Sequence, residues 1–224
     1  MFYRLECPDP LPQREIACVG DEVRWEPIFC PVHPGHRRAG KRLTPLSVVV
    51  TRPPSSHFLW TWLSDLLCTD ATLALLTAND VTGFATAPAV VRQSKRRNPT
   101  ANLPVLHEII TLGWGAFSPE AGVRLSYHCP ACGHRRFSIE RPDLLVETCS
   151  WDGSDIFMVW PLPRYRFVSE RFAALIRDLG LSGGDLQPAS SIATRPGEPL
   201  SCGRLSHWMP EDRARQLGEP LGIY

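Results

Sequence analysis

The chain lacks a dominant charge and contains almost no lysine. Its 24 lysine and arginine residues stand against 23 aspartate and glutamate residues, which gives a formal net charge of +1, and the only lysines are Lys41 and Lys95. Proteins that capture DNA by electrostatic attraction usually carry a strongly basic surface. The composition therefore argues against nucleic acid as a general partner.

Long apolar segments are also missing. Residues 1–6 have neither the basic nor the apolar region of a secretory signal, and no apolar run approaches the ~20 residues that span a bilayer. We therefore expect a cytoplasmic protein without membrane association. With 43% hydrophobic residues in a chain of 224, a core can form without disulfide crosslinks.

The common catalytic motifs do not occur. The sequence contains no glycine-rich phosphate loop, no G-x-S-x-G nucleophile turn and no H-E-x-x-H metal motif. We expect a protein that is not an enzyme.

What the sequence does contain is a pair of cysteine-proline turns about a hundred residues apart. Residues 129–136 read Cys-Pro-Ala-Cys-Gly-His-Arg-Arg, and residues 30–38 read Cys-Pro-Val-His-Pro-Gly-His-Arg-Arg. Structural zinc takes four cysteine or histidine ligands, commonly from two such turns. In a reducing compartment, paired cysteines indicate a metal more often than a disulfide. We predict a structural Zn²⁺ site with the ligands Cys30, His33, Cys129 and Cys132.

Two alternatives remain open at this site. His36 competes with His33 for the fourth position, because aligning the two turns at Gly-His-Arg-Arg leaves Pro34 as an extra residue. The second turn could instead hold a redox pair or inert buried thiols. A redox C-x-x-C usually starts a helix, however, and the residues after Cys132 do not favour one.

The sequence also shows signs of an internal repeat. A shift of about a hundred residues aligns Trp60 with Trp160, Ala74-Leu75 with Ala174-Leu175, Gly83 with Gly183, and Pro88-Ala89 with Pro188-Ala189. We expect an α+β protein of two similar halves, each with a metal-binding turn (knuckle), strand, helix and strand, joined by a zinc-ribbon-like site. The halves would be residues 1–104 and 105–190, followed by an irregular tail, 191–224, in one compact unit.

Helix signals occur at equivalent places in the two halves. Ser169 is a suitable N-cap for a helix whose apolar residues recur at helical spacing before Gly180. In the first half, Thr69 or Asp70 would cap a helix that ends near Asn79. The β-branched and aromatic content of 46–51 and 156–160 predicts strands, and 92–104 has the composition of an exposed connection.

Tryptophan and arginine residues supply candidates for a partner surface. Tryptophan is enriched at binding hot spots, but Trp60 and Trp160 are better explained as core residues. The tryptophans in polar loop sequence and a basic cluster are the better candidates: Trp151, Trp208, Arg92, Arg96 and Arg97. A basic cluster of this kind is most often a solvated loop and only secondarily a contact for an acidic surface.

On these motifs the chain resembles the bacterial double-CXXCG-motif proteins, a paralogous group first noted in myxobacteria and regarded as immunity proteins of polymorphic toxin systems. The resemblance extends from Phe29 to about Pro188 and is strongest in 129–133 and 152–183. The second motif matches in full, whereas the first keeps only Cys30, with His33 in place of the second cysteine and Pro34 before the glycine.

This resemblance implies a cytosolic protein that binds a cognate toxin and neutralises it by occlusion. The competing interpretation is a zinc-ribbon-like module that binds nucleic acid or associates with transcription. Its phosphate contacts would come from the basic residues beside the two turns, Arg37, Arg38, Arg135 and Arg136.

Overall fold

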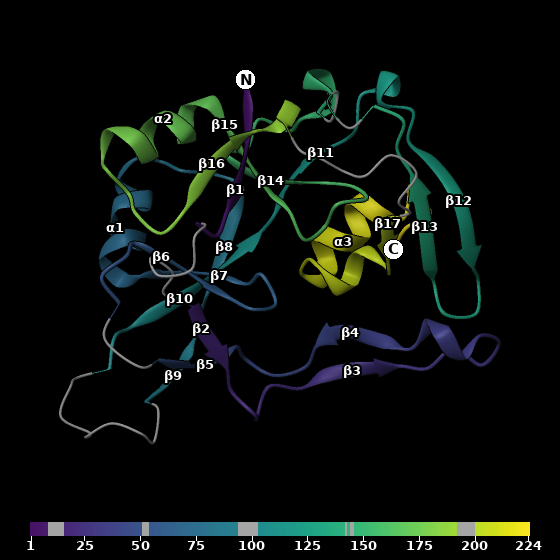
Figure 1. Ribbon diagram of the computed structural model, residues 1–224, viewed down its shortest axis with the longest axis horizontal. Coiled ribbons are helices and arrows are strands. Elements are labelled where there is room, and N and C mark those ends of the chain that lie inside the picture. The colour runs from purple at the N-terminus through teal and green to yellow at the C-terminus, as the bar shows by residue number, and fades with distance from the viewer. Residues whose placement is uncertain (9–15, 51–53, 94–102, 142, 144–145, 192–199) are drawn as a thin grey trace.

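The computed structural model describes residues 1–8, 16–50, 54–93, 103–141, 143, 146–191 and 200–224. Within these residues the fold is α+β, as expected, with three α-helices and strands that pair mostly antiparallel (Figure 1). No helix in the described part is long and apolar enough to cross a membrane.

The larger sheet has seven strands. Across the sheet they follow one another as β8 (Phe84–Pro88), β10 (Leu106–Thr111), β7 (Leu66–Thr69), β6 (Phe58–Thr61), β2 (Ile16–Val19), β5 (Ser47–Val50) and β9 (Val90–Gln93). All four residues of β6 are buried, in keeping with its central place and its aromatic composition.

The second sheet has five strands. They are ordered β11 (Gly113–Gly115), β14 (Ile156–Val159), β15 (Arg166–Ser169), β1 (Phe2–Glu6) and β16 (Asp185–Pro188). As in β6 of the larger sheet, every residue of β14 is buried. The strands expected at 46–51 and 156–160 are thus confirmed as β5 and β14.

The two sheets share a strand arrangement. From β8 to β2, three antiparallel pairs are followed by one parallel pair, and the same succession runs from β16 to β11. β1 comes early in the chain but lies between β15 and β16, whereas β10 lies between β7 and β8. Neither 1–104 nor 105–190 therefore completes a sheet from its own strands.

A helix follows the equivalent strand of each sheet. α1 (Asp70–Ala78) follows β7, and α2 (Glu170–Asp178) follows β15. The hydroxyl oxygens of Thr69 and Ser169 accept a hydrogen bond from the N–H three residues further on, at 3.2 and 3.1 Å. Such a bond satisfies one of the free N–H groups of the first turn. Both expected helices, with their caps, are confirmed.

One core cluster joins both sheets and both helices. Its members come from the two halves of the chain and include Phe58, Trp60, Leu66, Leu76, Ile109, Ile156, Val168, Phe172 and Ile176. In Figure 1 the two helices lie on the same side of the molecule, next to these strands. Removing this apolar surface from water is the main stabilising contribution to the fold.

Two glycines let the sheets approach each other closely. Gly83 and Gly183 have φ of +87° and +88°, and the carbonyl before each accepts the N–H of Ile156 and of Phe58, respectively. A Cβ at Gly83 would lie 2.1 Å from the Ile156 oxygen, and one at Gly183 would lie 2.1 Å from the Phe58 oxygen. Only glycine combines this backbone conformation with this approach.

Two smaller β structures extend from the sheets. One is a ribbon of β3 (Trp25–Ile28) and β4 (Arg38–Arg42), and the other is a sheet of β12 (Arg124–Cys129), β13 (His134–Ser138) and β17 (Leu200–Cys202). In Figure 1 the turn of the β3–β4 ribbon and the turn of the β12–β13 hairpin approach each other at the right.

The C-terminal segment does not form the irregular tail that was expected. In its described part, β17 pairs with β13, and the residues Glu211–Gly218 form the helix α3. Its apolar residues join a second core cluster, which contains Trp114, Phe137, Met158, Trp160, Cys202, Leu205, Met209, Ala214 and Ile223. Burial of these side chains holds the segment against the rest of the fold.

Candidate metal centre

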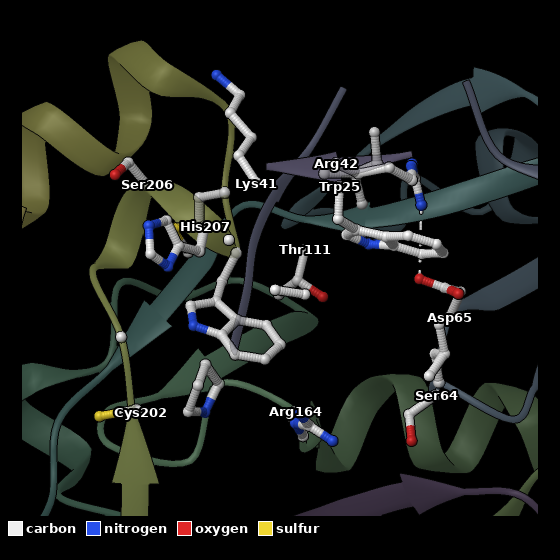
Figure 2. Close-up of a pocket in the computed structure, with 18 of the residues that line it drawn as sticks. Trp25, Lys41, Arg42, Ser64, Asp65, Thr111, Arg164, Cys202, Ser206 and His207 are labelled. Atoms are coloured by element: carbon white, nitrogen blue, oxygen red, sulfur yellow. Dashed lines mark ion pairs between the residues drawn. The ribbon is translucent and has the colours of Figure 1, made fainter. Parts of the chain in front are cut away.

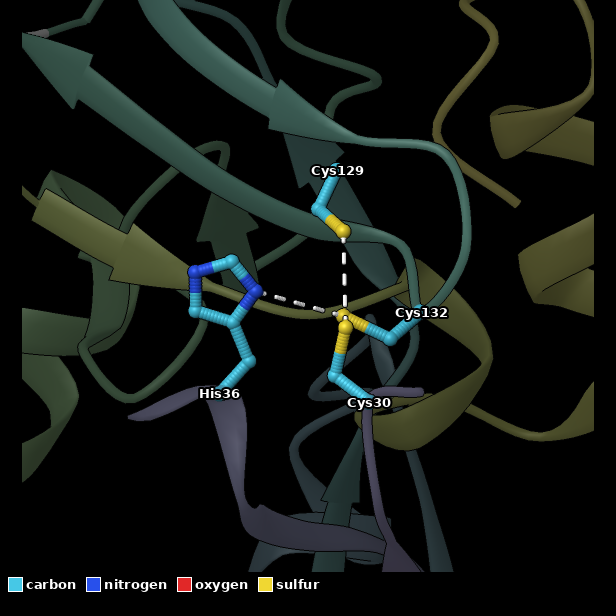
Figure 3. Close-up of side chains that lie close together, drawn as sticks. All are labelled: Cys30, His36, Cys129 and Cys132. Atoms are coloured by element: carbon cyan, nitrogen blue, oxygen red, sulfur yellow. Dashed lines mark hydrogen bonds between the residues drawn. The ribbon is translucent and has the colours of Figure 1, made fainter. Parts of the chain in front are cut away.

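The two hairpin turns bring four possible metal ligands together. Cys30 follows β3, and His36 lies in the 3₁₀ turn Pro34–His36 that leads into β4. Cys129 ends β12, and Cys132 lies in the turn before β13. Figure 3 shows the four side chains converging from the two hairpins.

Two of the distances between donor atoms match those of a tetrahedral zinc site. The four donor atoms all lie within 4.8 Å of one another. Cys30 Sγ is 3.6 Å from Cys129 Sγ, and Cys132 Sγ is 3.7 Å from His36 Nδ1. Bond lengths of about 2.0–2.3 Å to zinc place tetrahedral ligand atoms roughly 3.3–3.8 Å apart. The cluster is therefore compatible with a bound metal.

The fourth position belongs to His36 and not to His33, which corrects the first choice made from the sequence. His33 is exposed, and its ring stacks on the outer side of His36 with 4.7 Å between centroids. The extra residue, Pro34, starts the 3₁₀ turn, which buries His36 to 5% exposure. His33 contributes its backbone instead, because its N–H donates to Cys30 Sγ at 3.3 Å.

Donors around the Cys132 sulfur favour its thiolate form. Arg38 donates from Nη1 to Cys132 Sγ at 3.5 Å and from Nη2 to the Cys132 carbonyl at 2.6 Å. Burial raises the pKa of the Cys132 thiol, but the hydrogen bond from Arg38 and the other donors outweigh burial and lower that pKa to about 6. For Cys30, burial has the larger effect and raises the pKa. Thiolates are the form that binds metals.

A buried histidine completes the surroundings of the cluster. The ring of His134 packs on that of His36 with 4.3 Å between centroids. Burial, together with the neighbouring His36 and the positive charge of Arg38, lowers the pKa of His134 to about 4. His134 is therefore neutral at ordinary pH and adds no charge beside the cluster.

The tryptophans predicted to contact a partner pack partly against the fold. Trp151 is half-buried, donates its indole N–H to the Ser154 carbonyl at 2.9 Å and packs edge-on against Phe2. Trp208 is half-buried against the core cluster around α3. Both lie in polar sequence, but long-range packing covers them. The exposed tryptophan is Trp62, at 68%, beside the β6–β7 turn, and no local signal distinguished it from the others.

The predicted basic cluster is only partly described. Arg92 is exposed at the end of β9 and forms an ion pair with Glu22. Arg96 and Arg97 lie outside the described residues.

The basic residues beside the two turns divide into two pairs. Arg38 donates a hydrogen bond to the Cys132 carbonyl at the metal centre. Arg135 is buried and donates to the carbonyls of Gly133 and Gly222. Arg37 and Arg136 are exposed, and their guanidinium groups lie over the rings of Phe29 and Tyr127. Only half of the four are thus available to a partner.

Comparison with protein-family models and with curated proteins found no match for this chain. The donor set and its surroundings carry the functional argument.

Proposed function

We propose that the cluster binds one zinc ion whose role is structural. Three thiolates and one imidazole are a typical donor set for structural zinc, and four protein ligands leave no position for a substrate. The ion would hold the β3–β4 ribbon against the β12–β13 hairpin, as the ion does in a zinc ribbon. Without it, the hydrogen bonds from Arg38 to Cys132 and the packing of His36 on His134 would hold the two turns together.

We propose further that the protein neutralises a cognate bacterial toxin by binding and occluding it. The observation that carries this proposal is an exposed surface at the two turns, here named the knuckle surface. Its residues are Phe29, Val32, Arg37, Tyr127 and Arg136. Phe29 is 62% exposed and Val32 71%, although most residues of their size and polarity are buried.

The chemistry of the knuckle surface suits a protein partner. Arg37 and Arg136 have no carboxylate partner among the described residues, and each lies over an exposed aromatic ring. Arginine and aromatic side chains dominate binding hot spots. The partner that fits is a protein with an acidic patch, which agrees with the immunity function implied by the CXXCG resemblance. Nucleic acid is less favoured, because Arg38 and Arg135 are bonded internally.

An ancient duplication is part of the same proposal. Three features recur in both halves and support it: the succession of strand pairs in the two sheets, the helix caps, and the reciprocal approach of Gly83 to Ile156 and of Gly183 to Phe58. In this proposal the first strand of each half, β1 or β10, lies in the sheet of the other half. That exchange would make the halves inseparable in folding.

Co-expression with candidate bacterial toxin domains tests the proposed function. Protection of the cells should scale with the molar ratio of this protein to toxin, and a 1:1 complex should survive gel filtration. Protection by far less than one equivalent would contradict occlusion.

Alanine variants locate the surface in the same assay. Arg37→Ala and Arg136→Ala should weaken the complex at unchanged melting temperature. Arg177→Ala is the matched control, since Arg177 also lies over a tyrosine ring, that of Tyr3, but on α2. An equal loss in all three variants would place the contact elsewhere.

A further inference from the structure

A cleft of about 640 Å³ lies beside the metal centre, between β4, the β6–β7 turn, β10, the segment before β15 and the segment after β17. Sites for small ligands usually have volumes of about 300–1,000 Å³ and occur where several elements meet. In Figure 2, Trp25 and Arg164 lie on opposite sides of the cleft, with Thr111 between them.

The lining carries more positive than negative charge. Its basic residues are Arg38, Lys41, Arg42, Arg164 and Arg166, and its acidic residues are Asp65 and Glu108. Arg42 pairs with both carboxylates, and Lys41 pairs at 3.1 Å with Glu211 at the rim. Arg38 donates a hydrogen bond to Cys132 Sγ at the metal centre. Arg164 is exposed and has no carboxylate partner among the described residues, so its charge is available to a ligand.

Arg164 also belongs to an aromatic wall. Its guanidinium carbon lies 5.5 Å from the centre of the Trp208 ring, and Trp25 lines the opposite side of the cleft. Indole rings and a stacked guanidinium group form flat surfaces against which a planar ring packs. The wall therefore offers a stacking surface and a positive charge at one place.

Unsatisfied polar atoms concentrate in the same lining. In the described part of the chain, six buried side-chain nitrogens have no hydrogen-bond partner. Five of them belong to residues that line this cleft: one each in Arg38, Arg166 and Trp208, and both ring nitrogens of His134. Buried polar groups without partners are rare in folded proteins, and each requires an explanation. Most of these nitrogens are N–H donors, which a ligand rich in oxygen acceptors would satisfy after small movements of the wall.

We propose that this cleft binds a mononucleotide, with the base against the tryptophan wall and the phosphate at Arg164. Hydroxyl groups in the lining, those of Ser64, Thr111, Ser201 and Ser206, suit contacts to the sugar. This site is independent of toxin neutralisation, because none of the residues of the knuckle surface lines the cleft.

Calorimetric titration of the full chain with the four 5′-ribonucleoside monophosphates tests the site. The matching nucleosides and inorganic phosphate are the partial ligands. At least one monophosphate should bind 1:1 with Kd of about 0.1 mM, and its nucleoside and phosphate should each bind at least about tenfold more weakly. Absence of binding by all four, or phosphate binding as tightly as the nucleotide, would overturn the proposal.

Two arginine variants assign the binding to the cleft. Arg164→Gln should weaken nucleotide binding about tenfold and nucleoside binding much less, since the charged contact to the phosphate is lost while the Trp208 ring remains. Arg136→Gln is the control, because Arg136 is also an exposed arginine over an aromatic ring but lies outside the cleft. Nucleotide affinity unchanged in Arg164→Gln, or lowered equally in both variants, would show that the site is not this cleft.

Discussion

The sulfur atoms of Cys30 and Cys129 lie 3.6 Å apart although 99 residues separate them in the chain. Their closeness joins two hairpins that share little other apolar contact, since the cluster around the cysteines adds only Ile28. A metal at this point would crosslink two hairpins that are far apart in the chain.

The identity of the fourth ligand is tested by two histidine variants. The purified protein should contain one zinc per chain by metal analysis. His36→Ala should lose the zinc, because its imidazole lies within the cluster, and His33→Ala should keep it, because the His33 ring is exposed. The reverse result would show that the turn rearranges when metal binds.

Metal loss should loosen the two hairpins more than the main core. Structural zinc contributes on the order of 10 kcal/mol in small metal-dependent domains. We expect less here, because a core cluster between the main sheets lies apart from the cysteines. Cys132→Ser should lower the melting temperature and increase amide exchange in β3, β4, β12 and β13.

Cys149→Ser is the control for that variant, since Cys149 is an exposed cysteine outside the cluster. A metal-free Cys132→Ser protein with native stability and unchanged exchange would contradict the structural role.

Asp155 should make stability dependent on acid pH. Its carboxylate is buried and accepts hydrogen bonds from Arg171, from Ser169 Oγ at 2.8 Å and from the Thr82 N–H at 2.9 Å. Burial raises the pKa of Asp155, but these donors outweigh burial and hold it below its ordinary value. The contribution is therefore present above the unfolded pKa of about 3.9 and is lost as pH falls toward the lower folded pKa.

Asp155→Asn should lower the free energy of unfolding by about 2 kcal/mol at neutral pH and flatten its fall below pH ~4. Denaturant unfolding across pH measures both effects. Asp143→Asn, which breaks the exposed pair with Arg141, should change little. Equal losses in the two variants would contradict a special role for the buried carboxylate.

The glycines at the sheet junction should tolerate no side chain. Gly83→Ala and Gly183→Ala place a Cβ 2.1 Å from a carbonyl oxygen at positive φ, so each should cost about 3 kcal/mol or more. Gly153→Ala separates the two causes, since Gly153 has φ +86° but nothing within 4 Å. It should cost about 1–2 kcal/mol from backbone strain alone. Similar losses at all three positions in denaturant unfolding would argue against the close approach.

Features that depend on neighbouring residues could be predicted from the sequence by itself. Short-range preferences predict the hydroxyl caps of α1 and α2, the glycine turns after them and the aromatic strand β14. The spacing of the cysteines within each turn likewise predicts that they are metal ligands. Backbone hydrogen bonding and side-chain shape act within a few residues, so these preferences survive in the fold.

Other features were decided only by the tertiary structure. The choice of His36 over His33 depends on how the 3₁₀ turn at Pro34 faces the other hairpin. The burial of Trp151 and Trp208 and the placement of β1 beside β15 depend on residues far away in the chain. The sequence determined which groups could bind a metal, cap a helix or pack in the core. Long-range packing determined which of these groups meet, because burial of apolar surface stabilises contacts between residues at any separation along the chain.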